Sequence, residues 1–233
     1  MATHGEIMTG TTDTTSAGFL GALTAARLLA IIRGTDADAA IATALLLVEE
    51  GFQFLEISLT TVDALRVIDT VAREVAGGAQ IGAGTVLSAA DATGAREAGC
   101  RFLVTPAITP GASEAVRMGI PVIAGALTPS DTYAAMALGA SAVKLFPASL
   151  GGPMYLSALR DPFPATPFVP VGGVDLAAAE EYWSRGAVAV GIGGPLVKDA
   201  ASGGDLEGLR DRARAFLKAA AGHPAGSRPA RRS

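Results

Sequence analysis

The sequence predicts a single α/β domain, a (β/α)8 TIM barrel with an extra N-terminal helix. Short apolar runs rich in Val and Ile alternate with segments of helical periodicity along almost the whole chain. The runs are apolar at nearly every position, which is typical of parallel strands that are covered on both faces. Eight such strand–helix units in about 190 residues is the count of this fold, at its compact end.

The expected strands can be placed one by one. They are LLAIIR (28–33), FQFLEISL (52–59), AQIGAGT (79–85), RFLVTPA (101–107), PVIAGAL (121–127), SAVKLFPA (141–148), FVPVGG (168–173) and AVAVGIGG (187–194). A further helix over residues 17–27 is expected to cover the bottom of the barrel. A doubly wound open sheet is the alternative, but IIRGTDADA after the first strand is not the Gly-rich turn that binds dinucleotides in such sheets.

The two ends of the chain differ from the middle. Residues 1–16 are rich in Thr and Gly, and residues 221–233 are rich in Pro, Gly and Arg, so we expect a disordered arm and a disordered basic tail around one domain at 17–220. Both histidines, His4 and His223, lie in these end segments. Their position disfavours histidine-dependent hydrolysis and histidine-bound zinc.

Composition excludes several classes of protein. A net charge of -4 disfavours a nucleic-acid surface, which would need a basic patch. The single cysteine, Cys100, excludes an internal disulfide and a multi-cysteine metal site, and we expect it to be a small buried hydrophobe. No apolar run approaches the ~18 residues of a membrane span, and the first residues lack the charged-then-apolar order of a secretion signal. We therefore expect a cytoplasmic protein with neither a nucleic-acid nor a membrane partner.

In a barrel of this kind, the chemistry belongs to the C-terminal ends of the strands and to the loops that follow them. Those ends carry a short set of polar groups and glycines. The set comprises Arg33, Glu56, Ser58, Thr60, Thr85, Thr105, Thr128, Lys144 and the pairs Gly172–Gly173 and Gly193–Gly194. Each residue alone has an ordinary structural explanation, but a lysine, a carboxylate and an arginine on one rim together indicate a reaction centre.

Lys144 interrupts an otherwise apolar run, SAVKLFPA. Lysine is almost never fully buried unless it is paired, because desolvating a charge is costly. Apolar surroundings favour the neutral amine, and a nearby Arg33 favours it further by like-charge repulsion. A neutral amine attacks a ketone to form a Schiff base, whose iminium form draws electrons from the adjacent bonds. We therefore expect Lys144 to act covalently.

The neighbouring groups complete the expected reaction. Glu56 is the only acidic residue within the predicted strands and would shuttle protons. Arg33 can match a carboxylate with two parallel hydrogen bonds and would orient a 2-oxo acid. The glycine pairs of the last two strands expose backbone N–H groups where this fold commonly binds phosphate, although glycines there also serve as plain turns.

Seven motifs follow one another from about Leu28 to Leu196: AIIRG, FLEISLTT, IGAGTVL, FLVTPAIT, AVKLFPAS, VPVGGV and AVAVGIGG. Together they resemble the KDPG/KHG aldolases, which are class I, Schiff-base, pyruvate-dependent aldolases acting on 2-keto-3-deoxy-6-phosphogluconate and related acids. The resemblance implies an enzyme that needs no metal or other cofactor and that assembles as a homotrimer.

The resemblance also assigns roles to individual residues. Lys144 would be the Schiff-base lysine and Glu56 the proton-shuttling residue. Thr85 would hydrogen-bond the pyruvyl group, Arg33 would hold its carboxylate, and Pro106 would pack against the substrate carbons. The other expected substrate-binding residues are Thr60, Phe146, Gly172, Gly173, Gly193 and Gly194.

Three positions depart from the family pattern. Some members have arginine at the position of Thr60, and many have threonine at the position of Val171. Several have a phosphate-binding serine where this chain has Pro195, which offers neither a hydroxyl nor an N–H.

Phe146 is expected to fill the space below the site, where core packing explains it equally well.

The expected reaction is cleavage of a 2-keto-3-deoxy sugar acid, 6-phosphorylated and of the gluconate or galactonate type, to pyruvate and an aldehyde such as glyceraldehyde 3-phosphate. One alternative is a non-phosphorylated 2-keto acid such as 4-hydroxy-2-oxoglutarate. Another is a phosphate-binding barrel isomerase or epimerase that uses Glu56 as a base and has no covalent lysine. A third is a catalytically idle relative that serves as a scaffold or binding module.

Overall fold

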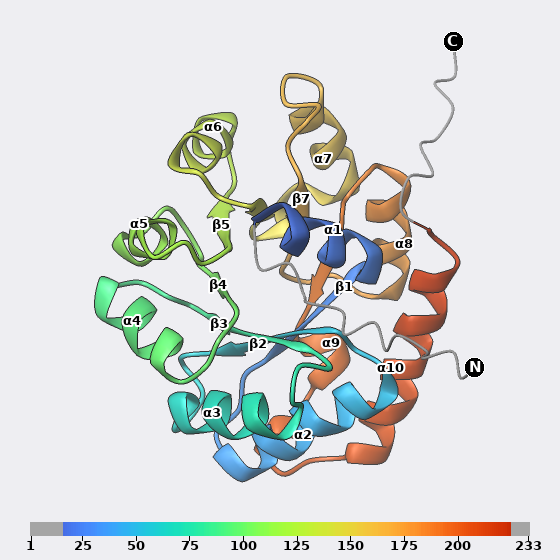
Figure 1. Cartoon of the computed structure of the whole chain (residues 1–233). Coiled ribbons are helices and arrows are strands. Elements are labelled where there is room, and N and C mark those ends of the chain that lie inside the picture. Colours follow the sequence, from blue (N-terminus) through green and yellow to red (C-terminus); the bar gives the residue numbers. More distant parts are fainter. Residues whose placement is uncertain (1–15, 225–233) are drawn as a thin grey trace, which may run out of the picture.

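The computed structural model describes residues 16–224, in which eight parallel strands form a nearly closed barrel surrounded by helices (Figure 1). The strands are β1 (Leu28–Ile32), β2 (Phe54–Ser58), β3 (Gln80–Gly84), β4 (Phe102–Val104), β5 (Val122–Ala126), β6 (Ala142–Leu145), β7 (Phe168–Pro170) and β8 (Val190–Ile192). Each lies within the range that the sequence predicts, and the predicted (β/α)8 barrel is confirmed.

The strands follow one another around the barrel in the order β7-β6-β5-β4-β3-β2-β1-β8. β8 therefore pairs with β1, with Leu28 opposite Val190 and Ala30 opposite Ile192. β7 and β8 are joined by an isolated parallel bridge between Val171 and Gly191 and by a hydrogen bond from the Val188 N–H, just before β8, to the Phe168 carbonyl. The barrel is thus closed along one weak seam.

Helices and short turns connect the strands. They are α1 (Ser16–Ala26), α2 (Ala37–Glu50), α3 (Ala64–Glu74), α4 (Ala89–Glu97), α5 (Pro110–Arg117), α6 (Pro129–Leu138), α7 (Gly152–Arg160), α8 (Leu176–Ser184), α9 (Gly194–Val197) and α10 (Leu206–Ala221), with the 3-10 turns η1 (Ala148–Leu150) and η2 (Ala200–Ser202). Several helices begin on a polar cap whose side chain accepts a hydrogen bond from a backbone N–H in the first turn. These caps are Asp36, Ser88, Thr109, Thr128, Asp175 and Asp205. Such caps fix the loops that leave the C-terminal ends of the strands.

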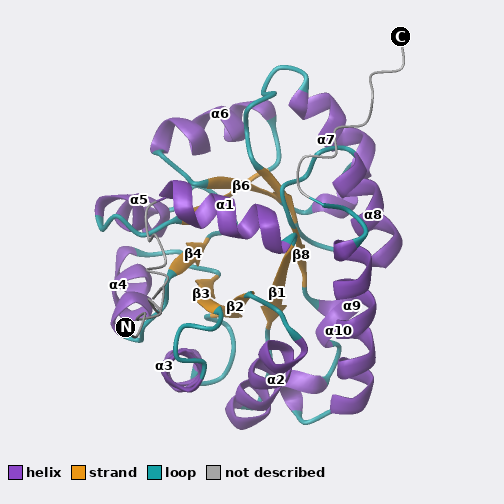
Figure 2. Cartoon of the chain, turned by 45° about the vertical axis from the view of Figure 1, so that its right-hand side comes forward, coloured by secondary structure: helices purple, strands orange, loops and turns teal. Residues whose placement is uncertain are grey.

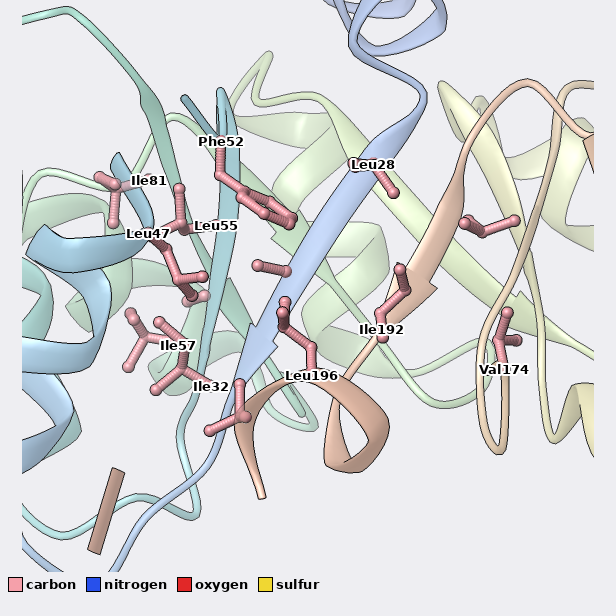
Figure 3. Close-up of a cluster of buried hydrophobic side chains, with 14 of the residues drawn as sticks. Leu28, Ile32, Leu47, Phe52, Leu55, Ile57, Ile81, Val174, Ile192 and Leu196 are labelled. Carbon is pink, nitrogen blue, oxygen red and sulfur yellow. The ribbon is translucent and has the colours of Figure 1, made fainter. Parts of the chain in front are cut away.

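Side chains alternate between two faces along each strand. On β2, Leu55 and Ile57 point outward into the cluster that packs the barrel against the helices, where Figure 3 shows them near Leu47 of α2. Phe54 and Glu56, at the intervening positions, point into the barrel, and Phe54 belongs to a separate inner cluster. The period of two therefore decides which residues of a strand can reach an internal site.

Helix α1 lies across one end of the barrel (Figure 2). Its Phe19 ring packs against Phe54 and Phe102, with ring centroids 5.7 and 5.3 Å away, and Leu23 is fully buried in the same inner cluster. Phe54 and Phe102 are the first residues of their strands, so α1 closes the N-terminal end. The predicted extra helix is confirmed, with bounds shifted by one residue.

The C-terminal segment differs in part from the expected disordered tail. Helix α10 continues to Ala221, and the His223 ring lies 5.4 Å from that of Trp183. His223 therefore packs against α8. The rest of the predicted tail and residues 1–15 of the predicted arm, including His4, lie outside the described residues.

Two further expectations concern burial. Cys100 is a buried free thiol whose pKa burial raises to about 12, which confirms the prediction of a small buried hydrophobe. Of the helices in residues 16–224, none is long and apolar enough to cross a bilayer.

Candidate active site

A cavity of about 440 Å³ opens at the C-terminal ends of the strands, opposite α1. The sequence-predicted residues that line it are Arg33, Glu56, Thr85, Pro106, Lys144, Phe146, Gly172, Gly173, Gly193 and Gly194. They come from strands or loops spread over most of the chain, and the fold brings them to one place. Thr60 is the one residue with an expected substrate-binding role that does not line the cavity, and the other strand-end hydroxyl residues Ser58, Thr105 and Thr128 do not line it either.

Lys144 and Glu56 face each other deep in this cavity. The Lys144 Nζ lies 3.9 Å from Glu56 Oε1, and the two residues are only 6% and 1% exposed. Lys144 occupies the inward-facing position of β6 two residues after Ala142, just as Glu56 follows Phe54 on β2. The gap is longer than a direct hydrogen bond but too short for a water molecule to lie between the two atoms, so a molecule that bridges them must contact both from the side.

The electrostatics of Glu56 suit a group that gains and loses a proton. Burial raises the pKa of its carboxyl above the ordinary value, and the charges of Lys144 and Arg33 offset part of that increase. Its Oε2 atom is buried and has no hydrogen-bond partner among the described residues. An ionised carboxylate in this position is incompletely solvated, which is the physical cause of the raised pKa.

A glycine makes room for the Glu56 carboxyl. Gly84 ends β3 beside Ser58 of β2, and a Cβ added to Gly84 would overlap Glu56 Oε1 and Cδ. The side chain of Glu56 therefore occupies the volume that any larger residue at position 84 would fill. The IGAGT sequence thus shapes the site through a missing side chain as well as through its threonine.

Thr85 is held by a short chain of hydroxyl groups. Its backbone has φ +60°, a left-handed conformation that is uncommon for threonine, and its Oγ1 lies 2.9 Å from Ser58 Oγ. Ser58 is fully buried, and its Oγ also lies 2.8 Å from Thr60 Oγ1. Thr60 therefore reaches the site only through Ser58, which differs from the expectation that Thr60 binds substrate directly.

The side walls are formed by Arg33, Pro106 and Phe146. Phe146 is 37% exposed, and the Lys144 Nζ lies 5.1 Å from the centre of its ring. The ring also packs against Gly172, where an added Cβ would lie 3.2 Å from it. Phe146 thus lines the cavity beside Lys144, and its expected position below the site stays a prediction.

The last two strands end in the expected glycine turns. Gly172 and Gly173 have φ +100° and +75°, which glycine adopts without strain, and they lie across the β7–β8 seam from Gly193 and Gly194. Val171 and Pro195 line the same part of the cavity. The residues that line this end of the cavity therefore offer backbone N–H groups, and the nearby hydroxyl is that of Ser149, whose Oγ would lie 3.5 Å from a Cβ at Gly173.

Sequence reasoning missed one charged residue of the site. Lys198, which follows α9, lines the cavity together with Ile31 and Val197. It lies beyond the eighth predicted strand, in a segment without recognisable periodicity. Its distance of four residues from the Gly193–Gly194 turn is the signal that could have found it.

Among residues 16–224, no group of three or more His, Cys, Asp or Glu side chains is placed to hold a metal ion. The charged side chains lining the cavity are Arg33, Glu56, Lys144 and Lys198. The arrangement provides one amine, one proton-transfer group and cations for an anionic ligand.

Comparison with known proteins gives matches over most of the chain. A family model described as "KDPG and KHG aldolase" matches residues 21–209. A probable 2-dehydro-3-deoxy-6-phosphogalactonate aldolase of Rhizobium meliloti (strain 1021) is 37% identical over 194 residues, which are 82% of this chain and 90% of that protein.

Solved structures agree with these sequence matches. One described as native KDPGal superposes with a TM-score of 0.79 at 32% identity, covering 84% of this chain and 95% of the other. A KDPG aldolase from Legionella pneumophila, solved with pyruvate captured as a covalent carbinolamine intermediate, gives a TM-score of 0.73 at 26% identity and covers 88% of this chain and 98% of that one.

Proposed function

The chain belongs to the family of KDPG and KHG aldolases, and from that premise we propose that it is a class I aldolase for a 6-phosphorylated 2-keto-3-deoxy sugar acid of the gluconate or galactonate type. Its products would be pyruvate and glyceraldehyde 3-phosphate. The observation that carries the proposal is the placement of the Lys144 amine 3.9 Å from the Glu56 carboxyl at the base of one cavity.

In the proposed reaction, the Lys144 amine adds to the C2 ketone to give a carbinolamine, whose hydroxyl takes a proton from solvent in the open cavity and leaves as water to form an iminium ion. Glu56 then takes the proton of the C4 hydroxyl through a water molecule, the C3–C4 bond breaks, and its electron pair moves toward the iminium nitrogen to leave an enamine and the free aldehyde. Protonation of C3 and hydrolysis release pyruvate and restore the amine. The raised pKa of Glu56 supports its part, because a proton carrier works best when its pKa approaches the working pH.

The remaining side chains have simple tasks in this scheme. Arg33 binds the substrate carboxylate, and Thr85 hydrogen-bonds the pyruvyl group from a hydroxyl that Ser58 orients. Pro106 and Phe146 enclose the carbon chain. The Legionella pneumophila relative with its captured carbinolamine supports the covalent step by analogy.

A trapping experiment tests the covalent step. Pyruvate and borohydride together should add one reduced pyruvyl group to the protein, and peptide mass mapping should place it on Lys144. Lys144→Met should take up none, while Lys218→Met should react as the wild type does. An adduct on Lys198 or Lys218, or none, would contradict the assignment, and the last result would favour a barrel isomerase that uses Glu56 alone.

The phosphate on the substrate needs a separate test, because Val171 and Pro195 offer no hydroxyl. The backbone N–H groups of the Gly172–Gly173 and Gly193–Gly194 turns support a phosphate at this end of the cavity. Pro195→Ser would add a donor, and one hydrogen bond to a charged group is worth about 1.5–3 kcal/mol against about 0.5–1.5 for a neutral one. We expect it to lower KM for a phosphorylated substrate by roughly threefold to a hundredfold.

The same change should leave a non-phosphorylated substrate unaffected, and Gly193→Val should block phosphorylated substrates first. If both variants treat the two classes alike, 4-hydroxy-2-oxoglutarate becomes the better candidate. A retro-aldol screen of phosphorylated and non-phosphorylated 2-keto-3-deoxy acids, with detection of pyruvate, would then choose the substrate directly.

The proposal extends to a homotrimer in the cytoplasm. The large apolar side chains Tyr133, Leu150 and Met154, on α6, η1 and α7, are exposed in the isolated chain, which supports association. Light scattering coupled to size-exclusion chromatography measures the mass directly, and a monomer at micromolar concentration would contradict this part.

A further inference from the structure

We propose that Lys198 is the cation that recognises a second anionic group on the substrate, separate from the carboxylate that Arg33 binds. The inference rests on the proposed function, because it assigns a further group of the same substrate. It concerns a phosphate or a carboxylate on the part of the substrate that becomes the aldehyde product.

Lys198 is presented to the cavity by a firmly anchored turn. Leu196 of α9 is fully buried in the cluster that packs the barrel against the helices, and Figure 3 shows it near Ile32 and Ile192. The backbone N–H of Lys198 donates to the Gly194 carbonyl at 3.0 Å. The lysine itself is exposed and lines the cavity beside Gly193 and Gly194. Its backbone is therefore fixed while its side chain is free to meet a ligand.

The backbone of Lys198 is also strained. It has φ +47° and ψ −121°, a combination that glycine adopts readily and that a residue with a Cβ avoids. A lysine in this conformation costs folding free energy that glycine would save. Strain of this kind is concentrated at ligand clamps and active sites, so it is a reason to look for a function of the side chain.

The charge of Lys198 is not neutralised locally. Within residues 16–224, no carboxylate lies within salt-bridge distance of its ammonium group. The neighbouring carboxylate of Asp199 packs against Gly204, where an added Cβ would overlap it. The positive charge is therefore available to a bound anion.

The turn that carries Lys198 is tied to the loop that carries Arg33. A Cβ at Gly34 would overlap the Ala201 carbonyl, and the Thr35 N–H donates to Ser202 Oγ at 3.0 Å. Arg33 and Lys198 thus belong to one connected rim with a fixed spacing between their backbones. With Lys144 below them, the cavity has three basic side chains to the single carboxyl of Glu56.

This balance suits a substrate with two anionic groups. An ammonium group on a flexible stem binds phosphate or carboxylate as a point charge and needs no fixed geometry. It can therefore stand in for the hydroxyl that Pro195 and Val171 cannot supply. The shared chemistry is a terminal anion, and its two possible sources can be separated by experiment.

The test uses the full chain in the condensing direction, with saturating pyruvate and three aldehydes: glyceraldehyde 3-phosphate, glyoxylate and glyceraldehyde. Lys198→Met removes the charge and keeps an unbranched side chain that is one atom shorter, Lys198→Arg keeps the charge, and Lys218→Met on α10 is the matched control. We expect Lys198→Met to lower kcat/KM for an anionic aldehyde by roughly tenfold to a hundredfold. The neutral glyceraldehyde should change by less than about twofold.

Loss for glyceraldehyde 3-phosphate alone would identify phosphate as the natural anion, and loss for glyoxylate alone a carboxylate. Lys198→Arg should retain most of the wild-type preference, and that preference should fall as ionic strength rises. Equal effects of Lys198→Met on charged and neutral aldehydes, or no effect on either, would overturn the inference. Borohydride trapping of pyruvate on Lys144 in the same variants reports separately on the proposed function.

Discussion

At the N-terminal end of the barrel, Phe54 packs against the rings of Phe19 and Phe102; two residues further along the same strand, Glu56 faces Lys144. The same change occurs on β6, where Ala142 belongs to the inner apolar cluster and Lys144 lines the cavity. Two consecutive inward-facing positions of one strand therefore belong to different regions, the first to the packed core and the second to the candidate active site.

Two differences between the ends account for this. Helix α1 covers the N-terminal end and fills it with Phe19 and Leu23, whereas the C-terminal end is left open as a cavity. The glycines of β3 follow the same division: Gly82 makes room for the Phe102 ring and Gly84 for the Glu56 carboxyl. The type of a residue alone therefore does not reveal its role. The space that a glycine leaves is filled by a packed ring at the N-terminal end of the barrel and by a side chain of the candidate active site at the C-terminal end.

The strongest way to test this division is to remove the acid at the open end. Glu56→Gln keeps the shape of the side chain and loses the transferable proton, so we expect kcat to fall by about 10² to 10⁴. Steady-state kinetics with pyruvate detection measure the loss. Borohydride trapping on Lys144 should be retained and the thermal midpoint should be no lower than that of the wild type, and normal turnover would move the proton-transfer role elsewhere.

The matching change at the closed end should act on stability. Phe54→Ala removes a buried ring that contacts Phe19 and Phe102, and truncations of this kind cost about 3–5 kcal/mol. Urea denaturation gives the change in the free energy of unfolding. Activity per folded molecule should stay close to the wild type; a large drop in kcat would mean that the two ends are not independent.

Replacing Gly82 and Gly84 of β3 by alanine, one at a time, compares the two ends of the barrel with the same kind of substitution. Gly84→Ala would displace Glu56, and a misplacement of about 1 Å can cost up to about 10² in rate, so we expect kcat to fall about tenfold to a hundredfold. Gly82→Ala would overlap the Phe102 ring and cost about 1–3 kcal/mol of stability with little effect on kcat. If both variants lost activity and stability alike, β3 would act as one unit.

The smallest expected effect is a dependence of stability on pH. Burial raises the pKa of Glu56 in the folded protein above its ordinary 4.5, so above that pH the unfolded chain binds fewer protons than the folded one. The free energy of unfolding should fall as pH rises from 4.5 through the raised value, by up to about 1.4 kcal/mol per pH unit.

Glu56→Gln lacks this ionisation, so the wild type should lose stability relative to the variant as pH increases. Urea denaturation of both proteins between about pH 4 and 8 measures the difference. Parallel curves would show that Glu56 ionises normally, and a wild type that gains stability with pH would show that its pKa is lowered.

Much of the fold follows from local sequence, because parallel strands covered on both faces leave apolar runs that few other structures produce. Because alternate residues of a strand point into the barrel, Glu56 and Lys144 can be expected in one cavity. Arg33 and Thr85 directly follow the last residues of their strands, so they can be expected at the same end of the barrel. These residues are readable because each lies within a strand or immediately after one.

The rest depends on contacts that no local pattern encodes. Lys198 follows a four-residue helix and reaches the cavity because Leu196 and the Gly34–Ala201 contact hold its turn in place. Thr60 has the expected sequence neighbours, but its hydroxyl faces Ser58 and not the cavity. His223 lies against Trp183, a partner forty residues earlier that composition could not indicate.

The pairing of β8 with β1 has a consequence for how the protein is made. β1 is the first strand of the barrel to be translated, and its partner strand ends about 160 residues later, which at 5–20 residues per second is a wait of roughly 10 to 30 s. Throughout that interval, the free edge of β1 is open to mispairing with another nascent chain. Arg33 likewise leaves the ribosome long before Lys198, so the substrate pocket is completed only by the last part of the barrel to be translated.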